Sequence, residues 1–569
     1  MSEVGQIRRA NSGSLPSHSQ ILVALSFGNY PSINYAPLPI SQRQWNVTDS
    51  FSRQLGVHAL KFGVDYRRLS TEPKPATFWE TVVFTSESQV LSNTAASASV
   101  KTSAAIPSEP IYTNLSLFAQ DEWRVTSRLS ASLGLRWELN PPPGDGYGNI
   151  PYTLNETSNL ATATVAPKGT PLWHTTYNNF APRIGLAYQA HRQQGYDTVL
   201  RSGFGVFYDT GNTLGSQGIS GLGYAATRTL TKVSFPLSGS ETTLPAASID
   251  PPYNGTVYAF SPDLKLPYTL EWNVAVEQAL GEKQTLTLTY LGAGAHRLLS
   301  EYIYYPGQLG NSNFTASGLA YITRNQASSS YNALQVQYDR HLSKGLQALL
   351  SYTWSHSLDN NSSNGGNNEG LLRGNSDFDI RNNFQAAITY DLPFHVRETL
   401  LRSLTGGWSV DTRISARSGL PIDVYSGYTP LADGFQQLVR ADMVPGVPVY
   451  LNVPSAPGGR IINVKAFTTP ASGYLGDEPR NFLRGFASWQ ADFAIRREFP
   501  LPGKAHLQFR TEAFNLFNHP NFGSIYNNLS NTSQFGYAYN TLNSQLGGLN
   551  SLYQMGGPRS LQAALKVIF

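Results

Sequence analysis

The sequence predicts an all-β fold: a transmembrane, antiparallel up-and-down β-barrel of the outer-membrane type. Three features of the chain predict it. Strand-length segments alternate apolar and polar side chains, short and long connections alternate between these segments, and the last segment stays apolar on one face to its final residue. Side chains of a strand repeat every two residues, and about ten residues cross a bilayer as a tilted strand.

The C-terminal segment, residues 560–569, has the most regular alternation. Leu561, Leu565 and Phe569 share one face, and Lys566 lies on the other. The terminal residues of a soluble protein usually fray into a poorly ordered tail. A strand that stays apolar up to a final aromatic residue instead indicates the closing strand of a bacterial outer-membrane barrel.

The same alternation recurs along the chain, and about sixteen segments have the pattern of strands in large outer-membrane barrels. In one of them, Leu334, Val336 and Tyr338 are expected to face outward, and Gln335 and Gln337 inward. Short turns are expected to join such segments into hairpins at 111–139, 267–292, 330–357 and 486–517, and residues 381–418 are also expected to form an up-and-down hairpin.

Long connections rich in Gly, Ser, Asn and Pro separate these hairpins. They cover residues 140–179, 209–266, 303–329, 358–380, 427–485 and 518–559. Outer-membrane barrels have short periplasmic turns and longer extracellular loops, so the alternation assigns the long connections to the cell exterior. Because the long connection 518–559 would then be extracellular, the strand at 560–569 would run back toward the periplasm and place Phe569 at the periplasmic rim.

The composition fits a membrane barrel better than a soluble domain. Charged residues make up 14% and aromatic residues 12% of the chain, whereas soluble domains have about 25% charged residues. The net charge of +4 is dispersed, so nucleic acid is not an expected partner. The chain lacks cysteine, which excludes disulfides and thiol chemistry. No run approaches the roughly 18 apolar residues of a membrane helix.

Motifs of enzymes and metalloproteins find no support, and no catalytic, cofactor-binding or metal-binding residue is predicted. The acidic stretch from Asp359 to Glu369 fails the EF-hand spacing, because its twelfth position is Gly370. Asp377 and Asp379 lie beside Arg381, and we expect an ion-pair cluster at the base of a loop rather than a metal site.

Several segments resemble the TonB-dependent outer-membrane transporters, in their Oar-like branch. The resemblance lies in their shared order along the chain as much as in each motif. They are GVHALKFGVD at 56–65, NFAPRIGLAY at 179–188, YNALQ at 331–335, SDFDIRNNF at 376–384, GGW at 406–408 followed by SGLP at 418–421, and EAFNLFNHPNFG at 512–523.

This resemblance implies a barrel of about 22 strands filled by a plug, with a TonB-binding segment ahead of the plug. No plug, signal peptide or preceding domain is visible, so the chain is expected to be the C-terminal barrel portion of a longer transporter, with an incomplete barrel. Residues 1–40 are expected to be a polar N-terminal segment with a weakly patterned first strand, and 41–569 the receptor-like barrel.

The resemblance also implies the setting and the partners. The protein would be monomeric in the bacterial outer membrane, in contact with the lipid bilayer and lipopolysaccharide. It would meet the TonB complex through the missing N-terminal region. The barrel assembly machinery would recognise the C-terminal strand, with Phe569 as the assembly signal.

Candidate contact residues lie on polar strand faces and in an aromatic connection. Arg413, Arg417, Arg510 and Glu512 are candidates for lining the lumen. The candidate ligand-contact loop contains Tyr302, Tyr304 and Tyr305.

The function expected from this resemblance is active uptake of a large, scarce substrate such as a siderophore, glycan or peptide, without covalent chemistry. Two alternatives remain open at this point: a plugless diffusion porin of about sixteen strands, and a secreted soluble adhesin or β-propeller. A propeller needs a repeat of about 40–50 residues, and the sequence shows none.

Overall fold

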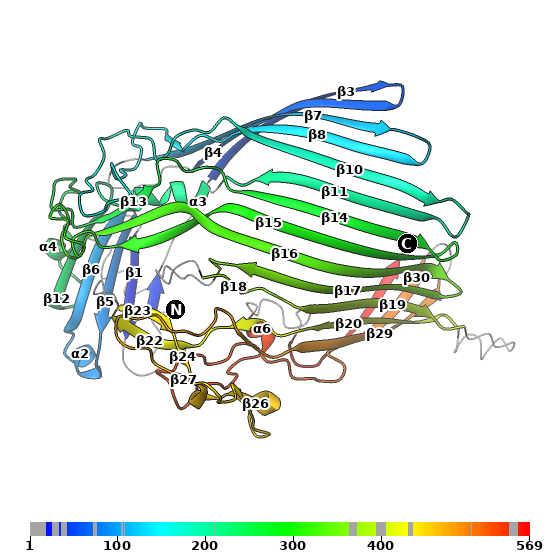
Figure 1. Cartoon of the computed structure of the whole chain (residues 1–569). Helices are drawn as coiled ribbons and strands as arrows, with labels where there is room; N and C mark the ends of the chain where they lie inside the picture. The colour runs from blue at the N-terminus through cyan, green and yellow to red at the C-terminus, as the bar shows by residue number, and fades with distance from the viewer. Residues whose placement is uncertain are drawn as a thin grey trace.

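One curved antiparallel sheet dominates the computed structural model (Figure 1). Its fifteen long strands follow one another in chain order, each paired with the next. The structure describes residues 19–25, 33–35, 42–71, 77–103, 106, 108–210, 212–362, 372–393, 406–430, 436–501, 503, 505–545 and 556–568.

The long strands average well over the length that a bilayer requires. They are β3 (Gln42–Leu55), β4 (His58–Thr71), β7 (Pro110–Arg124), β8 (Leu129–Leu139), β10 (Asn179–His191), β11 (Thr198–Tyr208), β14 (Tyr268–Ala279), β15 (Gln284–Tyr304), β16 (Leu319–Ser343), β17 (Leu346–Asp359), β19 (Asn382–Asp391), β20 (Trp408–Arg417), β29 (Ser488–Pro500), β30 (His506–Phe514) and β31 (Ser560–Ile568). Three short strands join this sheet, namely β9 (Gly144–Asp145), β13 (Thr256–Phe260) and β18 (Gly374–Asn375).

The expected up-and-down hairpins are confirmed. At one end of the sheet most strands connect through short turns, with a longer connection between β19 and β20, and at the other end the connections are long and folded (Figure 1). The turn between β16 and β17 consists of Lys344 and Gly345, with φ values of 51° and 77°. Two-residue hairpins require such positive φ values, because their twist then matches that of the strands.

The two faces of the sheet differ as the alternation predicts. Register places Tyr290, Leu334 and Trp354 in one cross-strand row, and all three side chains are exposed. Gln335 lies in the opposite row, which runs through β17 and β19 to Arg417. An exposed apolar face opposite a polar face is the pattern of a barrel wall with lipid on one side and a lumen on the other.

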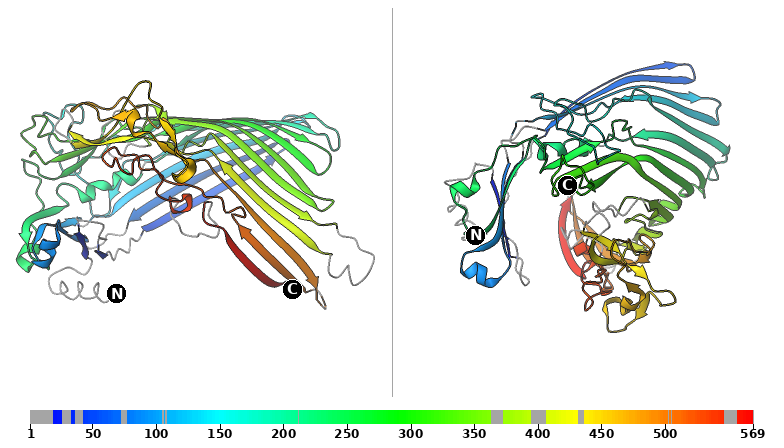
Figure 2. Two further views of the ribbon diagram at one scale, coloured as in Figure 1. Left: turned by 90° about the horizontal axis from the view of Figure 1, so that it is seen from below. Right: turned by 60° about the vertical axis from the view of Figure 1, so that its left-hand side comes forward.

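The sheet is open between its first and last strands. Within the described residues, β3 has a register only with β4, and β31 only with β30. Figure 2 shows β3 (blue) and β31 (red) at opposite margins of the curved sheet. Every residue of β3 is exposed, and one of its edges has no strand partner within the part of the chain that the structure describes. The expected incomplete barrel matches this open edge.

The long connections contain structure that alternation does not predict. Residues 303–329 were expected to be a loop, but β15 continues to Tyr304 and β16 begins at Leu319. The connection between β20 and β29 contains eight short strands. They are β21 (Pro421–Ile422), β22 (Tyr425–Pro430), β23 (Gln436–Arg440), β24 (Asp442–Met443), β25 (Tyr450–Asn452), β26 (Arg460–Ile462), β27 (Phe467–Thr468) and β28 (Leu483–Arg484).

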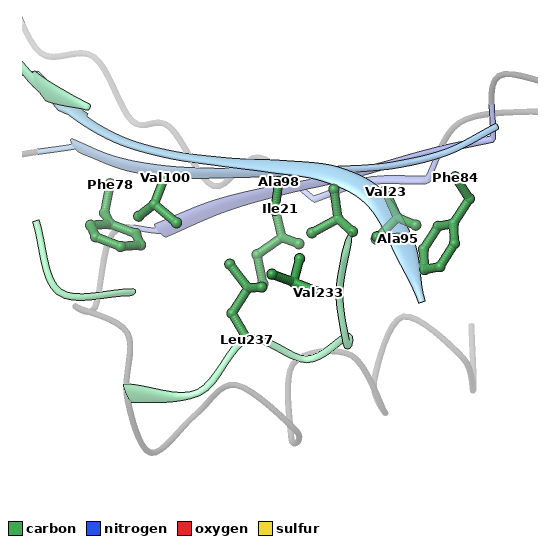
Figure 3. Packing of buried hydrophobic residues seen from close by; sticks show 10 residues of the cluster. Ile21, Val23, Phe78, Phe84, Ala95, Ala98, Val100, Val233 and Leu237 are labelled. Carbon is green, nitrogen blue, oxygen red and sulfur yellow. The ribbon is translucent and has the colours of Figure 1, made fainter. Parts of the chain in front are cut away.

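A separate five-stranded sheet lies at the loop end of the barrel strands (Figure 1). Its apolar face contains Ile21, Phe78, Val82 and Val100, and Figure 3 shows this packing. The polar N-terminal segment expected at 1–40 therefore contributes an apolar strand. The five strands are β1 (Ser19–Leu25), β2 (Ile33–Tyr35), β5 (Thr77–Phe84), β6 (Ala95–Ser103) and β12 (Ala226–Val233).

Helices are few and short in the described part of the chain. They are α2 (Glu87–Leu91), α3 (Asn212–Gly215), α4 (Gly239–Thr242) and α6 (Leu542–Gln545), with 3₁₀ turns η1 (Gln217–Ser220), η2 (Pro457–Gly459) and η3 (Val464–Ala466). None of these described helices has the length and apolarity needed to span a membrane.

Candidate functional site: the mouth pocket and the inner wall

A cavity of about 310 Å³ lies where β20 leaves the barrel and the long connections begin. We call it the mouth pocket. Arg417, the last residue of β20, lies on its wall with Asp377 and Asp423. Aromatic rings from two connections complete it, including Phe486, Phe522 and Tyr539. The pocket therefore combines charged groups with flat apolar surfaces, a composition typical of ligand sites.

A buried ion pair fixes one side of the mouth pocket. Arg480 donates from Nη1 to Asp359 Oδ1 at 2.8 Å, and both side chains are almost fully buried. A second Arg480 nitrogen, Nη2, donates to Ser362 Oγ at 2.6 Å. Since Asp359 ends β17 and Arg480 belongs to the connection before β29, these contacts hold that connection against the barrel rim. Loss of one partner of such a pair leaves a buried charge and costs about 3–5 kcal/mol.

The expected ion-pair cluster at Asp377 and Asp379 is present, but its arginine partners differ from the expectation. Arg484 pairs with Asp379, and Arg480 approaches Asp377 at 4.0 Å. No ion pair with Arg381, the neighbour in sequence, occurs among the described residues. The cluster therefore joins two connections that lie about a hundred residues apart in the chain, which sequence proximity could not reveal.

Asp423 is a buried carboxyl group beside the pocket. The backbone N–H of Asn481 donates to its Oδ1, and the side-chain amide of Asn481 donates to Asp377 Oδ1 at 2.7 Å. Burial raises the pKa of Asp423 above its ordinary value, while the Asn481 hydrogen bond and the charges of Arg440 and Arg480 act in the opposite direction. Both pocket carboxylates thus already accept hydrogen bonds from the protein.

Three of the four predicted lumen residues meet at a second cavity. This cavity, which we call the inner-wall cavity, has a volume of about 520 Å³ and lies over β19, β20, β29 and β30. Arg510 donates to Asp411 at 3.0 Å and to Glu512 at 2.8 Å. Arg413 lines the same cavity and is exposed. The fourth residue, Arg417, lies in the mouth pocket on the same face of β20.

A further charged cluster on the inner wall was not predicted as a site. Arg136 lies 3.1 Å from Asp65 and 3.0 Å from Glu138, across β4, β7 and β8. A cavity of about 270 Å³ lies over it. The alternating patterns of β4 and β8 contain these three residues on their polar faces, and that signal could have found the cluster. Which of these charges lie close together depends on the register between β4, β7 and β8, and the alternation alone does not predict register.

The predicted tyrosine loop is part of a strand. Tyr302 and Tyr304 belong to β15, and Tyr305 follows its end. Tyr302 is buried, with 9% of its surface exposed. The ring of Tyr304 lies 5.8 Å from the Arg324 guanidinium. None of the three is among the described residues that line the mouth pocket, and their role as ligand contacts stays a prediction.

The remaining expectations concern the assembly signal at the C-terminus and metal ions. Phe569, the predicted assembly signal, lies outside the described residues. Its neighbours Leu561, Leu565 and Val567 in β31 are exposed on one face. Within the described residues, no group of three or more His, Asp or Glu side chains is close enough to hold a metal ion.

Known proteins provide three comparisons. The family model described as outer membrane beta barrel domain matches residues 5–562, so the chain belongs to this family. The protein is therefore a β-barrel of the bacterial outer membrane, as the alternation indicated, and the soluble adhesin or propeller alternative is wrong. No curated protein has a matching sequence.

Solved structures of outer-membrane transporters have a similar fold. The transporter YddB from Escherichia coli aligns with a TM-score of 0.50 at 13% identity, over 97% of this chain and 57% of that one. The ferric-catecholate import receptor Fiu from Escherichia coli aligns with a TM-score of 0.44 at 12% identity, over 95% of this chain and 56% of that one. The iron transporter FrpB from Neisseria meningitidis aligns with a TM-score of 0.45 at 10% identity, over 93% of this chain and 55% of that one. The chain thus spans little more than half the length of these transporters.

Proposed function

We propose that the chain is the barrel of a TonB-dependent receptor that takes up a large, scarce substrate, such as a siderophore, glycan or peptide, across the outer membrane. The observation that carries this proposal is the mouth pocket, which lies at the loop end of the barrel strands, on the strand face that carries the inner-wall charges. The fold shared with the transporter YddB supports it.

The folded connections favour a receptor over an open diffusion porin. Val424, Ile462 and Phe535 form one buried apolar core with Leu483, so the connections after β20 and after β30 pack together at the mouth. Packed loops with a shaped pocket suit capture of a particular solute. The proposal assigns binding and passage to this chain, contains no covalent step, and therefore names no catalytic residue.

Several partners follow from this proposal. The receptor would act as a monomer surrounded by lipid and lipopolysaccharide, and the barrel assembly machinery would insert it. Energy would reach it through the TonB complex, which would contact a plug region of the receptor. Each of these partners is proposed for the complete receptor.

The experiment measures uptake by cells that express the complete receptor. Cells receive a candidate from each substrate class as the limiting nutrient, with TonB present or deleted. We expect one class to support growth only when TonB is present and the proton gradient is intact. Uptake that survives both TonB deletion and a protonophore would contradict the proposal and favour the porin.

A further inference from the structure

Two arginines mark successive positions along one face of β20. Arg417 lies at the end of the strand in the mouth pocket, and Arg413 lies in the inner-wall cavity. They are four residues apart and on the same side, since strand side chains alternate. At about 3.3 Å per residue, their Cα atoms are separated by roughly 13 Å.

Neither arginine has a carboxylate partner within the described residues. Arg417 donates one long hydrogen bond from Nε to Ser488 Oγ, at 3.4 Å. Arg413 has no hydrogen-bond or ion-pair partner there. A guanidinium group carries five N–H donors and is always charged. Most of the donors of both groups are therefore available to water or to a solute.

The nearby carboxylates are already engaged. In the inner-wall cavity, Asp411 and Glu512 accept from Arg510. Asp492 is opposite Arg413 in register, but its Oδ1 accepts from the Gln490 side chain at 2.7 Å and from the Asn515 backbone at 2.9 Å. In the mouth pocket, Asp377 and Asp423 accept from Asn481. At least one oxygen of each of these carboxylates is thus already engaged, whereas most N–H donors of Arg413 and Arg417 are not.

We propose that the transported substrate carries an oxyanion group, a carboxylate or phosphate, which Arg417 binds in the mouth pocket and Arg413 binds next in the lumen. This inference rests on the proposed function and names its substrate class. A guanidinium group binds these oxyanions through two parallel hydrogen bonds. The rings of Phe486, Phe522 and Tyr539 would pack on the uncharged body of the substrate.

The absence of cysteine from the chain makes the test direct. Ser415 lies between the two arginines on the same face, so Ser415→Cys places a single thiol there. In cells expressing the complete receptor, the thiol is labelled with a methanethiosulfonate reagent that carries either a sulfonate or a trimethylammonium group. The ratio of the two labelling rates reports the local electrostatic potential, and citrate is added as the oxyanion probe.

We expect the sulfonate reagent to react faster in the presence of both arginines. Arg413→Gln with Arg417→Gln should lower its rate about three- to tenfold and raise that of the cationic reagent, because each removes a unit charge about 7 Å from the thiol. Citrate should slow labelling of Ser415→Cys, and this protection should be lost in the double arginine variant. Glucose should have no effect.

Gln337→Cys is the matched control. Gln337 lies in the same cross-strand row as Ser415, three strands away on the inner face. Its labelling ratio should not change when the arginines are replaced. If both thiols react but citrate gives no protection and the arginines leave the Ser415→Cys ratio unchanged, the inference is overturned while the barrel function stands. If neither thiol reacts from outside, the proposed lumen itself is wrong, and the inference falls with it.

Discussion

Glu80 is the least expected residue of the structure, a carboxyl group inside an apolar core. It lies on β5 between Ile21 of β1 and Val100 of β6 in register, and only 1% of its surface is exposed. Neither carboxyl oxygen has a hydrogen-bond partner among the residues that the structure describes. Desolvation therefore disfavours the charged form and raises the pKa of Glu80 to about 7.

The five-stranded sheet should accordingly lose stability as the pH rises. The pKa of Glu80 is 4.5 when unfolded and about 7 when folded, so the folded sheet binds the proton more tightly. The stability that protonated Glu80 contributes is fully present below pH 4.5 and is lost as the pH rises through about 7. Well above pH 7 the free energy of unfolding of the sheet should be lower by on the order of 3 kcal/mol. Glu80→Gln should remove this dependence.

Hydrogen exchange of the β5 and β6 amides at pH 5 and pH 8, corrected for intrinsic exchange, measures the effect. Wild-type protection should drop at pH 8, and the Glu80→Gln variant should keep its protection. Glu87→Gln, at an exposed position in the same connection, is the control and should follow the wild type. Identical pH profiles for wild type and Glu80→Gln would show that this carboxyl group is solvated in the folded protein.

At the scale of strands, the two faces of β15 should respond in opposite ways to a charge. Leu288 lies on the outward face beside Val276 and Val336 in register, and 43% of its surface is exposed. Thr287 lies on the inner face beside Gln337. Leu288→Arg should lower the stability of the barrel by about 2–4 kcal/mol if it lies near the bilayer midplane. Thr287→Arg should cost little, because its side chain would reach water in the lumen.

The amount of folded barrel in outer-membrane fractions, read from heat-modifiable migration on gels, compares the two variants in the complete receptor. We expect a marked loss for Leu288→Arg and a near-normal level for Thr287→Arg. The reverse order would mean that the faces have been assigned to the wrong sides.

The last strand, β31, carries a prediction about assembly. The alternation of the sequence predicts that Phe569 shares the face of Leu561 and Leu565 and that its ring lies at the periplasmic membrane interface. Loss of the ring removes about 1.5–3 kcal/mol of apolar burial, which a large barrel tolerates. We nevertheless expect Phe569→Ala in the complete receptor to lower assembly sharply, because a recognition signal is lost as well.

Lys566→Ala is the matched variant for this prediction, since Lys566 lies on the opposite face of β31. Its assembly should stay near normal, as judged by folded protein in outer-membrane fractions. Equal assembly of both variants would indicate that the terminal aromatic residue is not read as a signal.

The long strands could be predicted from the sequence because a period of two over ten residues is a strong signal. The strands of the connections could not, because pieces such as Pro421–Ile422 and Leu483–Arg484 are too short to show a period. The same limit affects the site. Alternation identified Arg413 and Arg417 as inward residues, but only the folded connections separate them into two cavities.

At the scale of the whole molecule, the open edge of the sheet constrains how the barrel can close. β3 runs from the loop end to the short turn at Gly56, and β31 runs from a long connection toward the same end. The two edge strands therefore run in the same direction. Antiparallel pairing throughout a closed barrel then requires an odd number of further strands between them. Two copies of this sheet joined edge to edge would have to pair in parallel, which outer-membrane barrels avoid.

We predict that residues 1–569 alone do not form a stable closed barrel. Unpaired backbone groups of β3 and β31 would face lipid, and each costs several kcal/mol there. The isolated chain, refolded in detergent, should give no heat-modifiable band and should remain sensitive to protease at β3. The complete receptor, as the control, should give the band. A heat-modifiable, protease-resistant form of residues 1–569 would mean that the chain supplies one closing strand itself, and it would favour the sixteen-strand porin.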